Sequence, residues 1–196
     1  MPIPGSGGVS ADLAMCGIAG FFSLNHASAD VSVLARMVDV QRHRGPDDQG
    51  MRLFSLSGGA SIELRNESQQ PEGVYEGALG FNRLSVLDLS AHGHQPMANA
   101  DGSVFIAFNG EVYNAFDYTK ELEQSGVRFR SRTDTEVILS LYERFGIDGM
   151  LERLNGMFAF VIVDLRTREI HIARDHFGIK PLYWTIEGST LLFASE

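Results

Sequence analysis

Cys16 is the residue of this sequence that is best suited to covalent chemistry. It is the single cysteine of the chain, and it follows Met15 directly in the string Met-Cys-Gly-Ile-Ala-Gly. Removal of the methionine would leave Cys16 with a free α-amine, whose pKa of about 8 keeps part of it neutral at pH 7. Such an amine can accept the thiol proton as an internal base. The alternative is a buried hydrophobic cysteine, which position alone favours.

Asn109 and Gly110 follow an apolar strand and are suited to binding a developing negative charge. The side-chain amide of Asn109 and the backbone N–H of Gly110 are both hydrogen-bond donors. Preorganised donors of this kind form the oxyanion hole of acyl-transfer enzymes. The alternative interpretation is a plain Asn-Gly turn.

Two charged residues, Arg83 and Asp134, are candidates for binding an amino acid. Arg83 interrupts an apolar strand, and its planar guanidinium matches a carboxylate in two parallel hydrogen bonds. Asp134 precedes an amphipathic helix, and its carboxylate suits an α-ammonium group. The alternatives are a buried salt bridge for Arg83 and a helix N-cap for Asp134.

Other polar strings are expected to be structural. The pair His92 and His94 lacks carboxylate partners at a recognisable spacing, so a polar loop is favoured over a metal site. Residues 57–61 resemble a pyrophosphate-binding loop but join two strand-like stretches, which indicates a hairpin turn. Residues 43–47 and 174–183 are rich in charged and turn residues and are expected to fix loops through ion pairs.

The apolar pattern predicts an α+β fold built from short strands and few helices. The expected strands are 16–24, 51–56, 60–64, 77–85, 104–109, 157–164, 170–174 and 181–185. The expected helices are 31–42, 118–125 and 134–145, with a helical turn at 148–154. Since 158–163 is continuously apolar, we expect a sheet that is covered on both faces.

Composition limits the classes of function. The chain has 196 residues, 44% of them hydrophobic, and a net charge of −9, which argues against a nucleic-acid partner. It has no apolar run of the roughly 20 residues that span a membrane and no secretory signal, so we expect a cytoplasmic protein. One cysteine excludes an intrachain disulfide and a cysteine-rich zinc site. Residues 1–15 are expected to be a disordered leader or to precede the true start, and the end at Glu196 indicates a truncated chain.

In combination, seven strings resemble the glutaminase domain of glutamine-hydrolysing asparagine synthetases. The strings are Cys-Gly-Ile-Ala-Gly at 16–20, Arg-His-Arg-Gly-Pro-Asp at 42–47, Asn-Arg-Leu-Ser-Val-Leu-Asp at 82–88, Asn-Gly-Glu-Val-Tyr-Asn at 109–114, Thr-Asp-Thr-Glu-Val-Ile-Leu at 133–139, Leu-Asn-Gly-Met-Phe-Ala-Phe at 154–160 and Arg-Asp-His-Phe-Gly-Ile-Lys-Pro-Leu-Tyr at 174–183. This family is a class II glutamine amidotransferase of the N-terminal-nucleophile hydrolase type. The resemblance covers residues 16–196 and implies a four-layer α/β/β/α sandwich.

The resemblance also implies roles for individual residues. Cys16 matches the nucleophile and its α-amine the base, while Asn109 and Gly110 match the oxyanion pair. The residues that match the glutamine-binding positions are Arg83, Leu84, Val86, Glu111 and Asp134. Among these, Arg83 would bind the α-carboxylate of glutamine and Asp134 its amino group.

The implied reaction is hydrolysis of glutamine to glutamate and ammonia. The ammonia would feed ATP-dependent asparagine synthesis from aspartate in a synthetase domain, which is expected beyond residue 196. No cofactor or metal is expected for the glutaminase domain, whereas ATP and Mg are expected for the synthetase domain. The expected partners are glutamine and that synthetase domain, and a homodimer is compatible with these features. Two alternatives remain open: another ammonia acceptor, in polysaccharide or secondary-metabolite pathways, and a catalytically silent scaffold.

Overall fold

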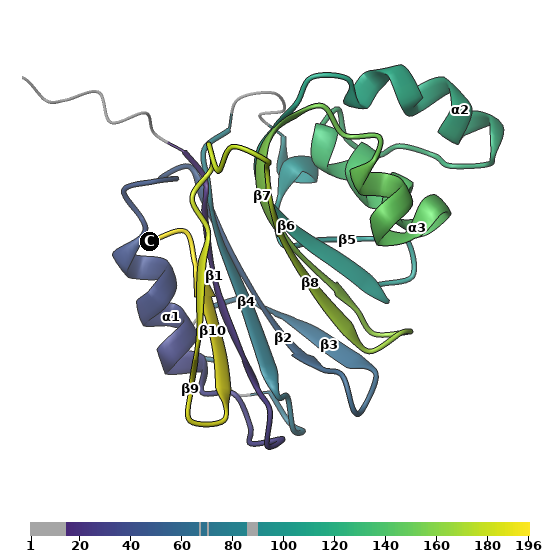
Figure 1. Ribbon diagram of the computed structural model, residues 1–196. Coiled ribbons are helices and arrows are strands. Elements are labelled where there is room, and N and C mark those ends of the chain that lie inside the picture. The colour runs from purple at the N-terminus through teal and green to yellow at the C-terminus, as the bar shows by residue number, and fades with distance from the viewer. Residues whose placement is uncertain (1–14, 67, 70, 86–89) are drawn as a thin grey trace, which may run out of the picture.

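The computed structural model describes residues 15–66, 68–69, 71–85 and 90–196, which form two antiparallel β-sheets packed face to face between helices (Figure 1). The larger sheet has six strands in the order β3-β2-β4-β1-β10-β9. In that order the strands are β3 (Ala60–Leu64), β2 (Asp48–Ser55), β4 (Gly77–Arg83), β1 (Gly17–Ser23), β10 (Thr190–Ala194) and β9 (Tyr183–Glu187). The central pair, β1 and β4, ends next to the candidate site.

The smaller sheet has four strands in the order β5-β6-β7-β8. Its strands are β5 (Met97–Ala98), β6 (Val104–Val112), β7 (Gly156–Asp164) and β8 (Glu169–Arg174). β6 and β7 pair along their whole length, from Val104 opposite Asp164 to Val112 opposite Gly156. This long ladder makes β6 a rigid support for the residues near its end.

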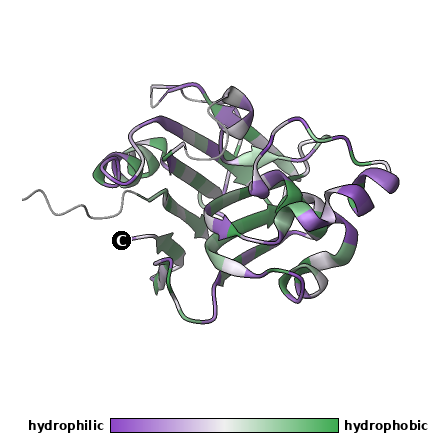
Figure 2. Ribbon diagram, turned by 90° about the horizontal axis from the view of Figure 1, so that it is seen from above, coloured by the Kyte–Doolittle hydropathy of each residue, from purple (hydrophilic) through white to green (hydrophobic). Residues whose placement is uncertain are grey.

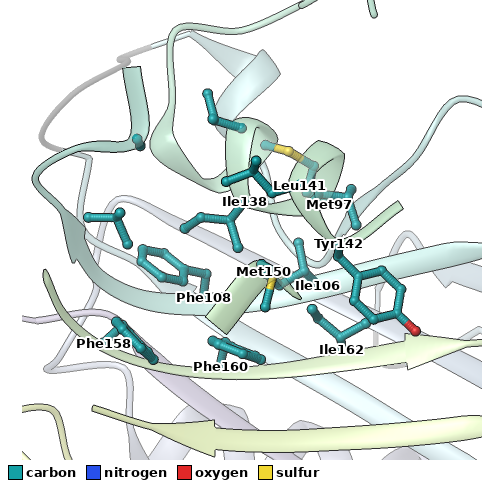
Figure 3. Close-up of a cluster of buried hydrophobic side chains, with 14 of the residues drawn as sticks. Met97, Ile106, Phe108, Ile138, Leu141, Tyr142, Met150, Phe158, Phe160 and Ile162 are labelled. Atoms are coloured by element: carbon teal, nitrogen blue, oxygen red, sulfur yellow. The ribbon is translucent and has the colours of Figure 1, made fainter. Parts of the chain in front are cut away.

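β7 contributes to two hydrophobic cores, which explains its continuous apolar sequence. Its side chains alternate between them: one set is Phe158, Phe160 and Ile162, and the other is Ala159, Val161 and Val163. The first set packs with Ile138 and Leu141 under a helix (Figure 3). The second set packs against the six-stranded sheet. The sheet is therefore covered on both faces, as the sequence predicted.

Helices cover the two outer faces. They are α1 (Val31–Val40) on one side and η2 (Ala115–Tyr118), α2 (Thr119–Gln124) and α3 (Asp134–Leu151) on the other. The short helix η1 (Ala91–Gly93) lies next to Arg83. α1 lies on the six-stranded sheet, where Gly80 leaves room for the side chain of Val38, and α3 lies on the four-stranded sheet. Figure 2 shows hydrophobic colouring concentrated on the strands. The predicted α+β fold and the four-layer α/β/β/α sandwich are confirmed.

The structure corrects several predicted boundaries. β6 continues past its predicted end at Asn109, because Asn109 and Gly110 pair with Ala159 and Phe158 of β7. The plain-turn alternative for Asn109-Gly110 is therefore wrong. The ladder can continue because Gly110 has no Cβ, and a Cβ there would come within 2.3 Å of the Met157 carbonyl oxygen.

The element α3 is interrupted at Gly146, whose φ of 69° and ψ of −176° are not helical, so a helix before Gly146 and a shorter one after it agree with the predicted helix 134–145 and the separate turn at 148–154. β9 begins two residues later than predicted, and the two-residue β5 was not predicted. The hairpin at residues 57–61 joins β2 to β3, as expected. None of the helices in the described part of the chain has the length and apolar character needed to span a membrane.

Candidate active site

Cys16 lies immediately before β1, where the pairing of β1 with β4 brings it beside Leu84. In that pairing Gly17 lies opposite Asn82, so the residue before one strand meets the residues after the other. The backbone N–H of Leu84 donates to Sγ of Cys16 at 3.4 Å, and the thiol donates to the Leu84 carbonyl oxygen at 3.7 Å. The register of the sheet therefore fixes the thiol against the backbone of β4.

A cavity of about 160 Å³ opens in front of this thiol. It is lined by Met15, Cys16, Arg83, Leu84, Gly93, Gln95, Phe108, Asn109, Gly110, Glu111, Thr133, Asp134, Thr135, Met157 and Lys180. The structure thus brings together all the predicted site residues that it describes. Val86 lies outside the described residues. The cavity is smaller than the roughly 300–1,000 Å³ of drug-sized pockets and suits a ligand the size of an amino acid.

Asn109 presents a buried donor at the wall of the cavity. The residue is 2% exposed, and its Nδ2 atom is buried with no hydrogen-bond partner within the described structure. A buried amide donor without a partner is costly, which is why such groups are rare outside functional sites. The arrangement suits a donor whose partner is a bound molecule.

Arg83 closes another side of the cavity. Its Nη1 donates to the carbonyl oxygen of Ser90 at 3.1 Å. Gly93 leaves the space that the guanidinium occupies, because a Cβ there would lie 2.0 Å from Nη2. The fork is therefore held between backbone segments, in an orientation suited to a carboxylate.

Asp134 is not the N-cap of α3, so that alternative is wrong. The N-cap is Thr133, whose side chain accepts from the N–H of Glu136. The Oδ2 of Asp134 instead accepts from the N–H of Val112 at 3.0 Å, which turns the carboxylate toward β6. Burial raises the pKa of Asp134 to about 6, and the nearby Glu111 carboxylate acts in the same direction. A ligand ammonium would stabilise its ionised form.

The thiol itself is not activated by its surroundings alone. Burial raises the pKa of Cys16, and the Leu84 N–H and the cations Arg83 and Lys180 oppose this only in part. The thiol is therefore protonated at neutral pH and needs a base. The Nζ of Lys180 also lies 3.3 Å from the sulfur of Met15, the residue that precedes Cys16.

The two charged strings fix loops as expected, although not always by ion pairs. Arg44 pairs with Glu196 at 3.3 Å and donates to the carbonyl oxygen of Cys16 at 3.2 Å. Asp175 holds its loop through backbone N–H groups, including those of Phe158 and Lys180. Backbone donors point inward at this tight loop, so a carboxylate can bind several of them at once.

His94 has carboxylate neighbours that the sequence did not reveal. Its Nδ1 lies 2.6 Å from Asp48, and its Nε2 lies 3.5 Å from Glu63. No group of three His, Cys, Asp or Glu side chains among the described residues is arranged to hold a metal.

Sequence reasoning missed Gln95 and Lys180 as residues of the cavity wall. Lys180 was assigned to a scaffold loop. For Gln95 the available signal was its position before Pro96, next to a strand too short to be recognised.

Known proteins are similar to this chain in sequence and in fold. The glutamine amidotransferase domain family matches residues 15–196. "Asparagine synthetase [glutamine-hydrolyzing] 2" of Bacillus subtilis is 37% identical over 187 residues, which cover 93% of this chain and 22% of that protein. "Amidase chry2" of Gibberella zeae is 33% identical over 192 residues, covering 93% of this chain and 26% of that protein. The chain thus spans about a quarter of the length of these relatives.

A solved structure shares the fold. Glutamine phosphoribosylpyrophosphate amidotransferase of B. subtilis, in complex with ADP and GMP, superposes with a TM-score of 0.74 at 25% identity. The match covers 92% of this chain and 42% of that one. On the family match and the identity to its relatives, the chain belongs to the glutamine amidotransferase domain family.

Proposed function

We propose that this domain hydrolyses L-glutamine to glutamate and ammonia, with Cys16 as the nucleophile. The observation that carries the proposal is the unpartnered, buried Nδ2 of Asn109 in the same cavity as the Cys16 thiol. Arg83 and Asp134 lie on the walls of that cavity with charges that match the α-carboxylate and α-ammonium of an amino acid. The backbone of Leu84 and the exposed carboxylate of Glu111 complete the binding surface.

In the proposed reaction, the free α-amine of Cys16 takes the thiol proton. The thiolate sulfur then bonds to the side-chain amide carbon of glutamine, and the oxygen becomes an oxyanion near Asn109 Nδ2 and the Gly110 N–H. Collapse breaks the C–N bond, and the proton held by the amine goes to the leaving nitrogen, so ammonia departs. Water then adds to the γ-glutamyl thioester, and glutamate leaves as the thiol is restored.

The fate of the ammonia belongs to the same proposal. The proposed acceptor is a synthetase domain that uses ATP and Mg to convert aspartate to asparagine. Relatives named glutamine-hydrolysing asparagine synthetases support asparagine as the product of such a domain. The proposed partners are therefore glutamine, that synthetase domain and, in a homodimer, a second copy of the chain. The proposed location is the cytoplasm, and the glutaminase domain itself needs no cofactor in this scheme.

The test compares three proteins: the chain as given, the form expressed from Met15 so that Cys16 becomes N-terminal, and the Cys16→Ala variant of that form. Glutamate release from glutamine is measured, and intact mass establishes which residue is first. Activity in the form that begins at Cys16, lost on substitution, supports the proposal. An inactive form with a free Cys16 amine contradicts it and favours the silent scaffold.

A second candidate shares the glutaminase reaction but differs in the acceptor. This candidate is favoured by the similarity to Amidase chry2, which at 33% identity is close to the 37% identity of the asparagine synthetase, with 93% of this chain covered in both cases. The acceptor would then be chosen outside this domain. Assays of the full-length gene product with ATP and aspartate distinguish the two, because asparagine forms in only the first case.

A further inference from the structure

Gln95 lines the cavity and contacts two of its other walls. It is 6% exposed, and its Oε1 accepts from the N–H of Phe108 at 2.6 Å. Its Nε2 donates to the Phe108 carbonyl oxygen at 3.3 Å and to Oγ1 of Thr135 at 3.4 Å. Phe108 directly precedes Asn109, and Thr135 directly follows Asp134. One side chain therefore joins the segment carrying the oxyanion donors to the helix end carrying the carboxylate.

This side chain takes the place of a missing strand residue. β5 pairs Met97 with Ile106, and continuing that register by two residues places Gln95 opposite Phe108. β5 starts at Met97, so the backbone of Gln95 is not part of the ladder. The amide of Gln95 carries the same donor and acceptor as a peptide group, so it binds the Phe108 backbone as a paired strand would.

The donor segment of β6 is thereby fixed at both ends. Gln95 binds the backbone of Phe108 at one end, and Asp134 accepts from Val112 at the other. The ring of Phe108 is anchored in the hydrophobic core beside Phe158 (Figure 3). Small displacements of catalytic donors cost rate, since an oxyanion hole acts only when its donors already face the developing charge.

We propose that Gln95 is a positioning residue of the glutaminase reaction, which holds the Asn109 and Gly110 donors in place and couples them to the N-terminus of α3. The inference rests on the proposed glutamine hydrolysis. Gln95 acts through Asn109, so its loss should affect the transition state far more than the binding of glutamine.

The chain offers a matched control at the other end of the same strand pair. Asn99 is 7% exposed, and its Oδ1 accepts from the N–H of Val104 at 3.1 Å. Its backbone N–H donates to the Val104 carbonyl oxygen at 2.9 Å. Asn99 therefore supports the β6 backbone with a side-chain amide, as Gln95 does, although its Nδ2 donates to Oε1 of Glu143 at 2.6 Å instead of to the strand. It lies outside the cavity lining. Replacing it removes comparable support without touching the donor segment.

The experiment compares Gln95→Met with Asn99→Leu, two substitutions of similar size that remove the amide, in the full chain and in the form that begins at Cys16. Gln95→Met should lower kcat roughly 10- to 100-fold, as expected for misplaced oxyanion donors. The KM for glutamine and the inhibition constant of glutamate should stay within about threefold, because ground-state binding is unaffected. Asn99→Leu should leave kcat within about twofold of the parent protein, since it disturbs no group that meets the transition state.

A conservative variant adds a pH signature. In Gln95→Glu the carboxyl keeps the acceptor for the Phe108 N–H, and its protonated form regains a donor. The ratio of its kcat to that of the parent should therefore rise as pH falls. Asn99→Leu introduces no titratable group, so its kcat ratio to the parent should stay constant with pH.

Hydrogen exchange tests the positioning without relying on activity. The Phe108 amide should exchange faster in Gln95→Met than in the parent protein, and its exchange rate should be unchanged in Asn99→Leu. The Val104 amide should exchange faster in Asn99→Leu and at an unchanged rate in Gln95→Met. Equal losses of kcat in both variants, a rise in KM matching the fall in kcat, or unchanged exchange at Phe108 would each overturn the inference. If the parent protein fails to hydrolyse glutamine, the proposed function falls, and the exchange data still decide whether Gln95 holds the donor segment.

Discussion

The six-stranded sheet presents Cys16 and Arg83 from the ends of its strands, whereas the four-stranded sheet presents Asn109 and Gly110 from within a paired strand. The thiol is held by two long sulfur contacts to Leu84. The proposed oxyanion donors lie in a continuous ladder that is supported by buried side chains on both faces. In the proposed reaction the sulfur must form and break a bond, while the donors need to stay fixed. The two sheets would then divide the site between a group that reacts and groups that are preorganised.

The comparison is tested most severely on the four-stranded sheet. Asn109→Ala should lower kcat for glutamine roughly 10²- to 10³-fold with little change in KM, the effect expected for loss of one oxyanion donor. Steady-state glutaminase assays measure both constants. Asn114→Ala is the control, because the Asn114 amide binds the Arg153 carbonyl oxygen instead of facing the cavity. A proportional change of kcat and KM in Asn109→Ala would count against the assignment.

On the six-stranded sheet, substitution of Arg83 is expected to weaken the binding of glutamine. Arg83→Ala should raise the KM for glutamine roughly 10- to 100-fold, since charge-assisted hydrogen bonds contribute about 1.5–3 kcal/mol. Glutamate should inhibit this variant correspondingly less. Arg83→Lys keeps the charge but not the planar fork, so its KM should lie between that of the parent protein and that of Arg83→Ala. A fall in kcat with an unchanged KM would place Arg83 outside the substrate contacts.

Asp134 belongs to the four-stranded side yet is expected to act in binding. Its pKa of about 6 means that the carboxylate becomes protonated as pH falls through that value, and it then no longer pairs with the ammonium of glutamine. In the Cys16→Ala variant, which cannot turn over, the Kd for glutamine should rise about tenfold for each pH unit below 6. This Kd is measured by titration calorimetry between about pH 5 and 8, in steps of roughly one pH unit. Adding Asp134→Asn should remove this pH dependence and weaken binding at pH 8, and a dependence that persists would assign it to another group.

Asp134 also affects the stability of the fold. Because the folded-state pKa of Asp134 is raised from 3.8 to about 6, ionisation destabilises the folded protein progressively across that pH window. Asp134→Asn should therefore increase the free energy of unfolding by about 2 to 3 kcal/mol at pH 8 and leave it nearly unchanged near pH 4. The new amide oxygen can still accept from the N–H of Val112. Urea unfolding at the two pH values checks this, and an equal change at both would contradict the assigned pKa.

Much of the site could be predicted from the sequence, because its residues stand in recognisable strings. Cys16, Arg83, Asn109 and Asp134 all belong to such strings, and the structure places all four in one cavity. The apolar pattern also indicated layers, since a strand buried on both faces needs cover on both sides.

What the sequence did not reveal depends on tertiary contacts. Thr133 is the helix cap and Asp134 faces β6, a choice decided by the N–H of Val112 far along the chain. Gln95 was missed because β5 has two residues and its register extends only through a side chain. His94 gains its carboxylate neighbours from β2 and β3, which local spacing does not encode.

In the proposed reaction, the sulfur of Cys16 is the atom that carries the acyl group. The form that begins at Cys16 is mixed with glutamine, quenched with acid during turnover and analysed by intact and peptide mass spectrometry. We expect a mass increase of one γ-glutamyl group on the peptide that starts at Cys16, absent from Cys16→Ala. Glutamate release without any such adduct, or an adduct on another residue, would contradict the central claim.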